Sequence, residues 1–184
     1  MTNLKSKAKS ENIPILSDEG ISLIISEIEK RKLSTMLEIG TAVGYSSIVL
    51  SEYLTFITTL ERDEALYLKA LENIKEYNKT NIEAVLVDAH DYKVDRFYDL
   101  IFIDAAKAQY EKFFIKYKDF LTDKGIIICD NLNFHNLDIN KVSRGTRSLI
   151  KKLENFKEFL KENKEFKTEF YNVGDGLSVS WRRK

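Results

Sequence analysis

The sequence predicts a single α/β domain with a doubly wound, mostly parallel seven-stranded sheet whose last two strands form an antiparallel hairpin. Apolar runs alternate with segments in which apolar residues recur at helical spacing, which is typical of a parallel sheet. Residues 98–103 and 126–129 are almost wholly apolar, as strands buried on both faces are. Two alternating runs flank Gly174-Asp175-Gly176, a turn that predicts the hairpin. The 184 residues, 43% of them hydrophobic, suffice for one domain spanning residues 1–184.

The elements are predicted in chain order. Residues 1–12 are polar and basic, so we expect a mobile segment there. Ser17 is placed to cap a helix with isoleucines on one face, at positions 21, 24, 25 and 28. Parallel strands are expected at residues 36–39, 56–60, 84–87, 98–103 and 126–129, with residues 122–125 as a turn. Further helices are expected from Tyr45, from Asp63, over residues 110–117 and from about Gly145, and the hairpin strands at residues 166–171 and 177–181.

Composition excludes several classes of protein. The longest apolar runs fall far short of the roughly 20 residues that span a bilayer, so no membrane segment is predicted. The lysine-containing N-terminus lacks the apolar core of a signal peptide, and the single Cys129 cannot form an internal disulfide. We therefore expect a cytoplasmic protein.

The net charge is zero, but the charge is unevenly distributed. Residues 141–184 contain twelve Lys or Arg against six Asp or Glu, and the preceding residues carry the opposite excess. A basic C-terminal region suggests a polyanionic partner that docks near it. A solvated amphipathic helix with ion pairs along its surface is the alternative interpretation.

The rest of the chain is organised around residues 36–46. An apolar run carrying one acid, Glu38, breaks into a loop with Gly40 and Gly44 and enters a helix at Tyr45. A strand, a glycine loop and a helix N-terminus in that order direct backbone N–H groups at a nucleotide, although the spacing is not the dinucleotide motif G-x-G-x-x-G. A buried Glu38 needs a compensating cation, and S-adenosylmethionine carries an ammonium and a sulfonium. The alternative is a plain strand-to-helix turn.

Acidic residues stand at or just past the ends of the five expected parallel strands: Glu38, Glu61, Asp88, Asp104 and Asp130. In an open α/β sheet the carboxyl ends of the strands form the ligand-binding edge. Glu61 follows the glycine loop by about 20 residues, where an acid can accept both ribose hydroxyls. It would equally suit the start of a helix. Asp88 is placed beside an adenine ring, although turn formation explains it almost as well.

A second kind of site is predicted where Asp104 meets Asp130 and Asn131. Two carboxylates and an amide oxygen from neighbouring strand ends suit a hard cation such as Mg²⁺. A pair of strand-terminating turns is the alternative. Lys107 lies three residues after Asp104 and could deprotonate or orient a hydroxyl held by that cation, or could simply be exposed at a helix start.

Three stretches together resemble the cation-dependent O-methyltransferases of the catechol and caffeoyl-CoA type: MLEIGTAVGYSS, LIFIDAAKAQYEKFF and IIICDNLNF. They are similar, in order and spacing, to that family's S-adenosylmethionine motif and its two metal motifs. The resemblance covers the chain from about Ile13 to its end. It implies the Rossmann-like class I methyltransferase fold, an enzyme that uses S-adenosylmethionine and Mg²⁺, and a homodimer.

The resemblance also implies roles for individual residues. Asp104, Asp130 and Asn131 would be the Mg²⁺ ligands, with Asp104 also close to the methyl donor, and Lys107 would be the catalytic lysine. The implied cofactor contacts are Glu38, Gly40, Tyr45 and Ser46 at the methionine end, Glu61 at the ribose, Ala89 at the adenine, and Ile15 in a segment that closes over the cofactor.

Within the family, stretches such as IPILSDEGISLI and VGDGLSVSWRRK are similar to the bacterial branch that methylates 5-hydroxyuridine at the tRNA wobble position, giving 5-methoxyuridine. Arg144 and Arg147 stand where that branch has an Arg-rich helix start, which suits phosphate contacts in the tRNA anticodon loop. The alternatives are a small-molecule catechol O-methyltransferase with the same donor and cation, and a non-catalytic RNA-binding protein with a vestigial nucleotide fold.

Two features depart from the family pattern. The sequence begins close to the cofactor segment, so we expect it to lack most of the N-terminal helix that helps bacterial relatives to cover the active site and pack the dimer. Val87 stands where the family usually has Gly beside the adenine, so we expect a differently shaped loop.

Overall fold

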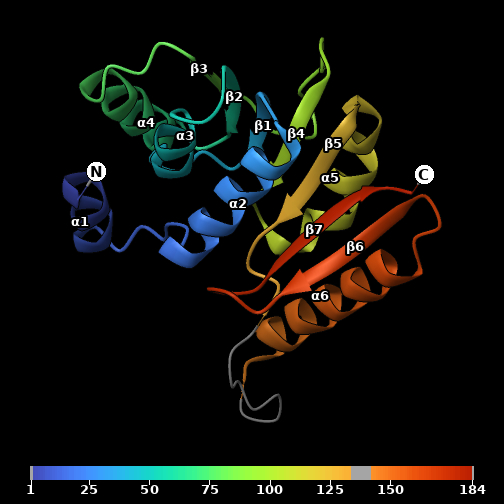
Figure 1. Cartoon of the computed structure of the whole chain (residues 1–184). Coiled ribbons are helices and arrows are strands. Elements are labelled where there is room, and N and C mark those ends of the chain that lie inside the picture. Colours follow the sequence, from blue (N-terminus) through green and yellow to red (C-terminus); the bar gives the residue numbers. More distant parts are fainter. Residues whose placement is uncertain (1, 134–141, 184) are drawn as a thin grey trace.

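The computed structural model describes residues 2–133 and 142–183, and these form one seven-stranded sheet with helices on both faces (Figure 1). The strands are β1 (Thr35–Ile39), β2 (Phe56–Glu61), β3 (Ile82–Leu86), β4 (Tyr98–Ile103), β5 (Leu121–Cys129), β6 (Phe166–Tyr171) and β7 (Leu177–Arg182). Their order in the sheet is β3-β2-β1-β4-β5-β7-β6. Strands β1 to β5 pair in parallel, and β7 runs antiparallel to β5 and β6. The predicted fold class is confirmed.

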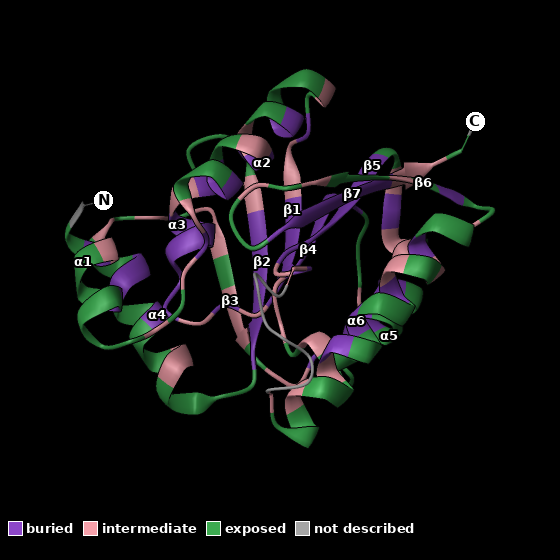
Figure 2. Ribbon diagram, turned by 90° about the horizontal axis from the view of Figure 1, so that it is seen from below, coloured by how far each residue is buried: buried purple, intermediate pink, exposed green. Residues whose placement is uncertain are grey.

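Helices pack on both faces because consecutive side chains of a strand point in opposite directions. The helices are α1 (Thr2–Ser10), α2 (Asp18–Arg31), α3 (Tyr45–Leu50), α4 (Glu64–Glu76), η1 (Lys107–Gln109), α5 (Tyr110–Tyr117), η2 (Lys118–Phe120) and α6 (Arg144–Glu162). In β1, Met36 belongs to the core cluster that contains residues of α1 to α4, whereas its neighbour Leu37 belongs to the cluster that contains residues of α5 and α6. Figure 2 shows the buried central strands between the two layers of helices. Within the described residues, no helix is long and apolar enough to cross a bilayer.

The strand order reverses at β1, whose neighbours are β2 on one side and β4 on the other. At such a reversal the connections leave in opposite directions and open a crevice beyond the carboxyl ends of the strands. Backbone hydrogen bonds extend the pairing past those ends: Gly40 N donates to Leu60 O at 3.0 Å, and Asp104 N donates to Ile39 O at 3.0 Å. The residues that follow these strands are therefore held side by side.

The N-terminal residues form a helix that packs against the core. Residues 2–10 form α1, and the exposed fractions of Leu4 and Ala8 are only 2% each. These two residues lie four apart, so they share one face of the helix and join the core cluster of α2 to α4. The Tyr77 hydroxyl accepts a hydrogen bond from Leu4 N at 3.2 Å, and Lys69 pairs with Glu11 at 2.5 Å. Only Leu4 and Ala8 are apolar among the lysines and polar residues of this helix, so the sequence carries a weak helical pattern. The mobility of residues 1–12 stays a prediction.

Strand β5 begins at Leu121, five residues before the predicted start at Ile126. The polar residues 122–125 were predicted to form a turn, but they belong to the strand, where the pairing with β4 shifts register. The buried carboxylate of Asp99 accounts for their polarity. It accepts from Thr122 Oγ1 at 2.6 Å and pairs with Lys124 Nζ at 3.1 Å.

Asp99 also binds the start of β1, since its Oδ2 accepts from Ser34 N and Ser34 Oγ, both at 2.8 Å. Burial raises the pKa of Asp99, but the hydrogen bonds from Thr122 and Ser34 outweigh it and leave the pKa below its ordinary value. An acid with a depressed folded-state pKa adds stability above its unfolded-state pKa, and that stability is lost as the pH falls through the folded-state value.

Asp99→Asn should therefore lower the free energy of unfolding at pH 7 by about 1–3 kcal/mol, because buried donors lose a charged acceptor. Urea unfolding followed by circular dichroism would measure it. The difference from wild type should shrink as the pH is lowered toward 3. The exposed Asp123 on the same strand supplies the control Asp123→Asn, with an expected change below about 0.5 kcal/mol. A difference independent of pH would contradict this account of Asp99.

Candidate functional site

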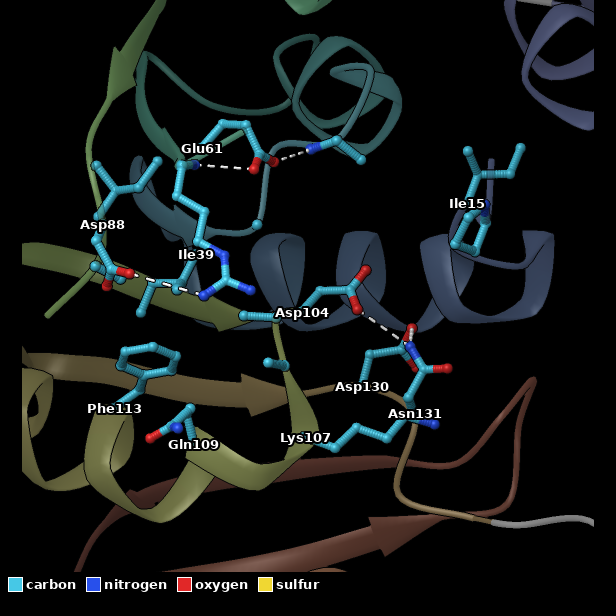
Figure 3. Close-up of a pocket in the computed structure, with 18 of the residues that line it drawn as sticks. Ile15, Ile39, Glu61, Asp88, Asp104, Lys107, Gln109, Phe113, Asp130 and Asn131 are labelled. Carbon is cyan, nitrogen blue, oxygen red and sulfur yellow. Dashed lines mark hydrogen bonds and ion pairs between the residues drawn. The ribbon is translucent and has the colours of Figure 1, made fainter. Parts of the chain in front are cut away.

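A cavity of about 600 Å³ lies at the carboxyl ends of β1 to β5 (Figure 3). Most of the predicted site residues line it: Ile15, Gly40, Glu61, Asp88, Ala89, Asp104, Lys107, Asp130 and Asn131. The sequence analysis did not single out further lining residues, among them Ala42, Arg62, His90, Gln109, Phe113 and Asp175. The cavity therefore brings together four of the five acidic strand ends, Glu61, Asp88, Asp104 and Asp130, whereas Glu38 does not line it.

The glycine loop, residues 40–44, follows the carboxyl end of β1 and has a backbone conformation that requires glycine. Gly40 has a φ of +105°, and a Cβ atom there would lie 2.0 Å from the carbonyl oxygen of Asp104. No side chain fits that gap, so the absence of a Cβ lets the loop pass directly over the end of β4. Gly44, with a φ of +80°, then precedes the first residue of α3.

Glu38, Tyr45 and Ser46 do not line the cavity. Glu38 is fully buried beneath the glycine loop, and its carboxylate accepts hydrogen bonds from the hydroxyls of Ser46, Ser47 and Thr59. Burial raises the pKa of Glu38, and these hydroxyl donors partly offset that cost. Hydroxyl groups of the protein thus partly compensate the burial of the Glu38 carboxylate, and they tie the end of β1 to α3 and β2. Direct contact of these three residues with the cofactor stays a prediction.

Glu61 joins the end of β2 to the glycine loop. Its Oε2 accepts from Ala42 N at 2.9 Å, and its Oε1 accepts from the backbone N–H groups of Arg62 and Asp63, both at 2.9 Å. A carboxylate can accept about four hydrogen bonds, so acceptor capacity remains for a hydroxyl in the cavity. Glu61 ends β2, three residues before α4 begins, and lines the cavity, while its contact with a ribose stays a prediction.

The turn after β3 forms the opposite wall. His90 N donates to Asp88 Oδ1 at 2.8 Å, which is the local turn bond expected of an Asp at this position. Arg62 reaches across from β2 and lies 3.8 Å from Asp88 Oδ2. The rings of His90 and Phe113 lie 4.7 Å apart, so a planar ligand here would meet aromatic surface as well as charge.

Asp104, Asp130 and Asn131 converge at the other end of the cavity (Figure 3). Asn131 Nδ2 donates to Asp104 Oδ1 at 3.1 Å and to Asp130 Oδ2 at 2.9 Å. Burial and the charge of Glu38 raise the pKa of Asp104 to about 6, and burial and the charge of Asp104 raise the pKa of Asp130 to about 7. Two acids held this close resist ionising together, and a cation between them would remove that cost.

These three side chains fit a hard divalent cation. Among the described residues, no cluster of three or more His, Cys, Asp or Glu side chains has the arrangement of a metal site. The available donors are therefore two carboxylates and one amide, the oxygen-rich set that Mg²⁺ takes while keeping water or substrate ligands. Turning the Asn131 amide by half a turn would present Oδ1 where Nδ2 now faces both acids.

Lys107 stands at the start of η1 and lines the same end of the cavity. Its positive charge lowers the pKa of both Asp104 and Asp130, whereas the charge of Asp175 raises both. Asp175 lies in the turn of the hairpin. Its backbone carbonyl accepts a hydrogen bond from Asn133 N at 2.7 Å. Nothing in the sequence near Asp175 indicates this approach, which depends on how the hairpin folds back over β5.

Arg144 and Arg147 do not line the cavity but lie exposed in the first turn of α6. Ser143 caps this helix, its Oγ accepting from Thr146 N at 3.1 Å. Helix α6 packs against η1, which contains Lys107, so the structure connects the basic helix to the cavity wall. Two more exposed cations, Lys151 and Lys152, follow before the first acid of the helix, Glu154.

Known proteins are related to this chain in sequence and in fold. The sequence profile of the O-methyltransferase family matches residues 3–183. A candidate caffeoyl-CoA O-methyltransferase from Staphylococcus aureus is 34% identical with a TM-score of 0.93, covering 99% of this chain and 91% of that one. The SAH-bound methyltransferase PaMTH1 of Podospora anserina is 25% identical with a TM-score of 0.81, covering 92% and 80%.

Curated relatives match over shorter segments. The protein-L-isoaspartate O-methyltransferase of Petrotoga mobilis is 36% identical over 62 residues, which are 34% of this chain and 29% of that protein. The chain thus aligns with less than a third of the length of this relative.

Proposed function

We propose that this chain, which belongs to the O-methyltransferase family, is an S-adenosylmethionine-dependent enzyme of the caffeoyl-CoA and catechol type. Its proposed acceptor is 5-hydroxyuridine at the tRNA wobble position. The proposed product is 5-methoxyuridine, and Mg²⁺ is the proposed metal. A cytoplasmic location and a homodimer belong to the same proposal. The observation that carries it is the pair Asp104 and Asp130 with Asn131, inside a cavity whose wall packs against a basic helix.

The acceptor chemistry suits this set of residues. In 5-hydroxyuracil the 5-hydroxyl and the O4 carbonyl are vicinal, as the two oxygens of a catechol are. Mg²⁺ held by Asp104, Asp130 and Asn131 would supply chelation of both oxygens and a lower pKa for the hydroxyl. The reaction moves one methyl group from the sulfonium of S-adenosylmethionine to the 5-oxygen, leaving S-adenosylhomocysteine, and the hydroxyl proton must leave.

In this proposal Lys107 would receive or steer that proton. It lines the cavity near both acids, where its ammonium also offsets their charge. Gly40 and Glu61 shape the cofactor side of the same cavity, so donor and acceptor would meet above the end of β4. Holding two reactants in line in this way can contribute ~7–11 kcal/mol to the acceleration.

The charge of α6 supports an RNA acceptor. Acidic residues stabilise the first turn of a helix, yet this helix has none there and starts with Arg144 and Arg147. Such a placement works against the helix dipole, so it is better explained by a polyanion outside the protein. The anticodon loop is single-stranded, and its base can turn into a cavity while basic groups hold the backbone phosphates.

Arg147→Glu should weaken tRNA binding about tenfold and reduce the salt dependence of binding, because one phosphate contact is lost and one repulsion is gained. Fluorescence anisotropy with labelled tRNA at several salt concentrations would measure both. The matched control is Lys164→Glu, the same charge reversal at an exposed lysine beyond the other end of α6. Equal tRNA affinity in wild type and Arg147→Glu would contradict the proposed docking of RNA on α6.

A small catechol-like acceptor is the second candidate, favoured by the likeness to the candidate caffeoyl-CoA O-methyltransferase of Staphylococcus aureus. Labelled S-adenosylmethionine offered with Mg²⁺ to tRNA bearing 5-hydroxyuridine, and separately to a simple catechol, distinguishes the two. Label in tRNA that disappears with EDTA is the expected result. Label in the catechol alone would overturn the RNA acceptor, and label that persists with EDTA would overturn the metal.

A further inference from the structure

The turn between β3 and β4 is fastened to α5 by one ammonium group. Lys116 Nζ donates to three backbone carbonyl oxygens of that turn. The acceptors belong to Ala89, His90 and Tyr92, at 2.8, 2.7 and 2.9 Å. An ammonium has three N–H donors, so this turn uses all of them. The next residue, Tyr117, donates from its hydroxyl to the same Ala89 oxygen at 2.6 Å.

The fastened turn is also a wall of the cavity, since Asp88, Ala89 and His90 line it. Two backbone N–H groups of the turn are held by Asp88, a residue of the turn itself. His90 N donates to Asp88 Oδ1 at 2.8 Å, and Asp91 N donates to Asp88 O at 2.8 Å. The peptide units after residues 89 and 90 are therefore held at both ends, with the carbonyl on Lys116 and the N–H on Asp88. The shape of this wall thus depends on a side chain that does not line the cavity.

The partners of Lys116 make it different from an ordinary surface lysine. Within residues 2–133 and 142–183, its ammonium contacts three backbone carbonyls and lies 5.2 Å from the centre of the Tyr117 ring, and it forms no ion pair. The charges that face it from the turn are Asp88 and Asp91, which support its charged form against the effect of burial. Irregular backbone holds one conformation only when its polar groups are satisfied, and Lys116 satisfies three of them.

We propose that Lys116 is a positioning residue for the cofactor, which sets the affinity for the adenosine half of S-adenosylmethionine by holding the backbone of residues 88–92. The inference rests on the proposed placement of adenine beside this turn. Pre-organisation of a binding wall raises affinity because the ligand does not have to order it. Asp88 fixes the N–H groups of this wall and Lys116 fixes its carbonyl groups.

The test compares Lys116→Met with Lys112→Met, an exposed lysine of the same helix. Calorimetry would measure Kd for S-adenosylhomocysteine and for 5′-methylthioadenosine, which lacks the amino-acid half. In Lys116→Met both Kd values should rise about tenfold, as expected when hydrogen bonds from a charged donor are lost. An equal loss for both ligands assigns the effect to the adenosine end. Lys112→Met should match wild type.

Several results would overturn the inference. Unchanged Kd values with a lower melting temperature would make Lys116 a purely structural residue. An equal loss of affinity in Lys112→Met would mean that the positive charge of the helix, and not the contacts of Lys116, causes the effect. A loss of affinity for S-adenosylhomocysteine alone would place the effect at the methionine end of the cofactor. If wild type binds neither ligand, the cofactor site itself is wrong and the inference falls with it.

Lys116→Arg is the second variant, in case the methionine variant does not fold. It keeps the charge, but a planar guanidinium cannot direct three donors at carbonyls that converge on one point. We expect both Kd values to rise about threefold, between wild type and Lys116→Met. Wild-type affinity in Lys116→Arg would show that charge alone suffices and would overturn the role of the three carbonyl contacts.

Discussion

Asp130→Asn is expected to lower kcat/KM for methyl transfer by about 10³-fold, because it removes one of two carboxylates from the proposed cation site. Asp130 is only 4% exposed, and its Oδ2 shares the Asn131 amide with Asp104, so the loss of its charge falls directly on the proposed site. The assay is transfer of label from S-adenosylmethionine to tRNA bearing 5-hydroxyuridine, with Mg²⁺ varied to saturation. Activity within tenfold of wild type would contradict the cation site.

The same substitution should have the opposite effect on stability in EDTA. Burial and the Asp104 charge raise the pKa of Asp130 to about 7, above its unfolded-state value. An acid with a raised folded-state pKa costs stability once the pH exceeds the unfolded-state value, and the cost is complete above the folded-state value. Asp130→Asn should therefore melt at a higher temperature than wild type at pH 8, and the two should converge near pH 4. A lower melting temperature at pH 8 would mean that the carboxylate is needed for folding.

Gly40→Ala is expected to abolish binding of S-adenosylhomocysteine and to destabilise the fold by about 3 kcal/mol or more. The added Cβ would lie 2.0 Å from the Asp104 carbonyl oxygen, on a residue whose φ of +105° already disfavours any side chain. Because that oxygen belongs to the backbone, it cannot rotate away. The end of β4 must move, and both the glycine loop and Asp104 would be displaced.

Thermal unfolding and calorimetry with S-adenosylhomocysteine would measure the two effects of Gly40→Ala. The chain offers a matched control in Gly145→Ala, where the new Cβ would meet nothing nearer than Ser143 Oγ at 3.8 Å. Within helix α6 that change should be neutral or stabilising, by up to about 1 kcal/mol. Gly40→Ala with the stability and affinity of wild type would show that the loop does not need its close approach to β4.

The strands were predictable because each buried strand leaves an apolar run in the sequence. Strand β4 has the predicted bounds, and β1, β2 and β3 begin or end within two residues of them. Strand β5 was predicted too short because its first residues are polar for a tertiary reason: Thr122 and Lys124 hold the buried Asp99. No local pattern reports a partner that lies on another strand.

The site was predictable to the extent that it follows from strand ends. Acids that close parallel strands must share one edge, and Asp88, Asp104 and Asp130 do line the cavity. Glu38 is the exception, because its side chain points to the face of α2 to α4 and is satisfied there by hydroxyls. Lys116 and Asp175 could not be predicted from the sequence, because the packing of α5 and of the hairpin turn brings them to the site.

Two different parts of the chain build the two ends of the cavity. The walls proposed for the methyl donor are built by the segments around β1, β2 and β3, whereas the acid pair, Lys107 and the hairpin turn come from β4 onward. The two halves meet along β1 and β4 and are not independent. Gly40 passes so close to the Asp104 carbonyl that a Cβ atom would lie 2.0 Å from it, and Lys116 of α5 holds the turn after β3. A substitution on the acceptor side that moves the end of β4 or α5 is therefore expected to change cofactor affinity as well.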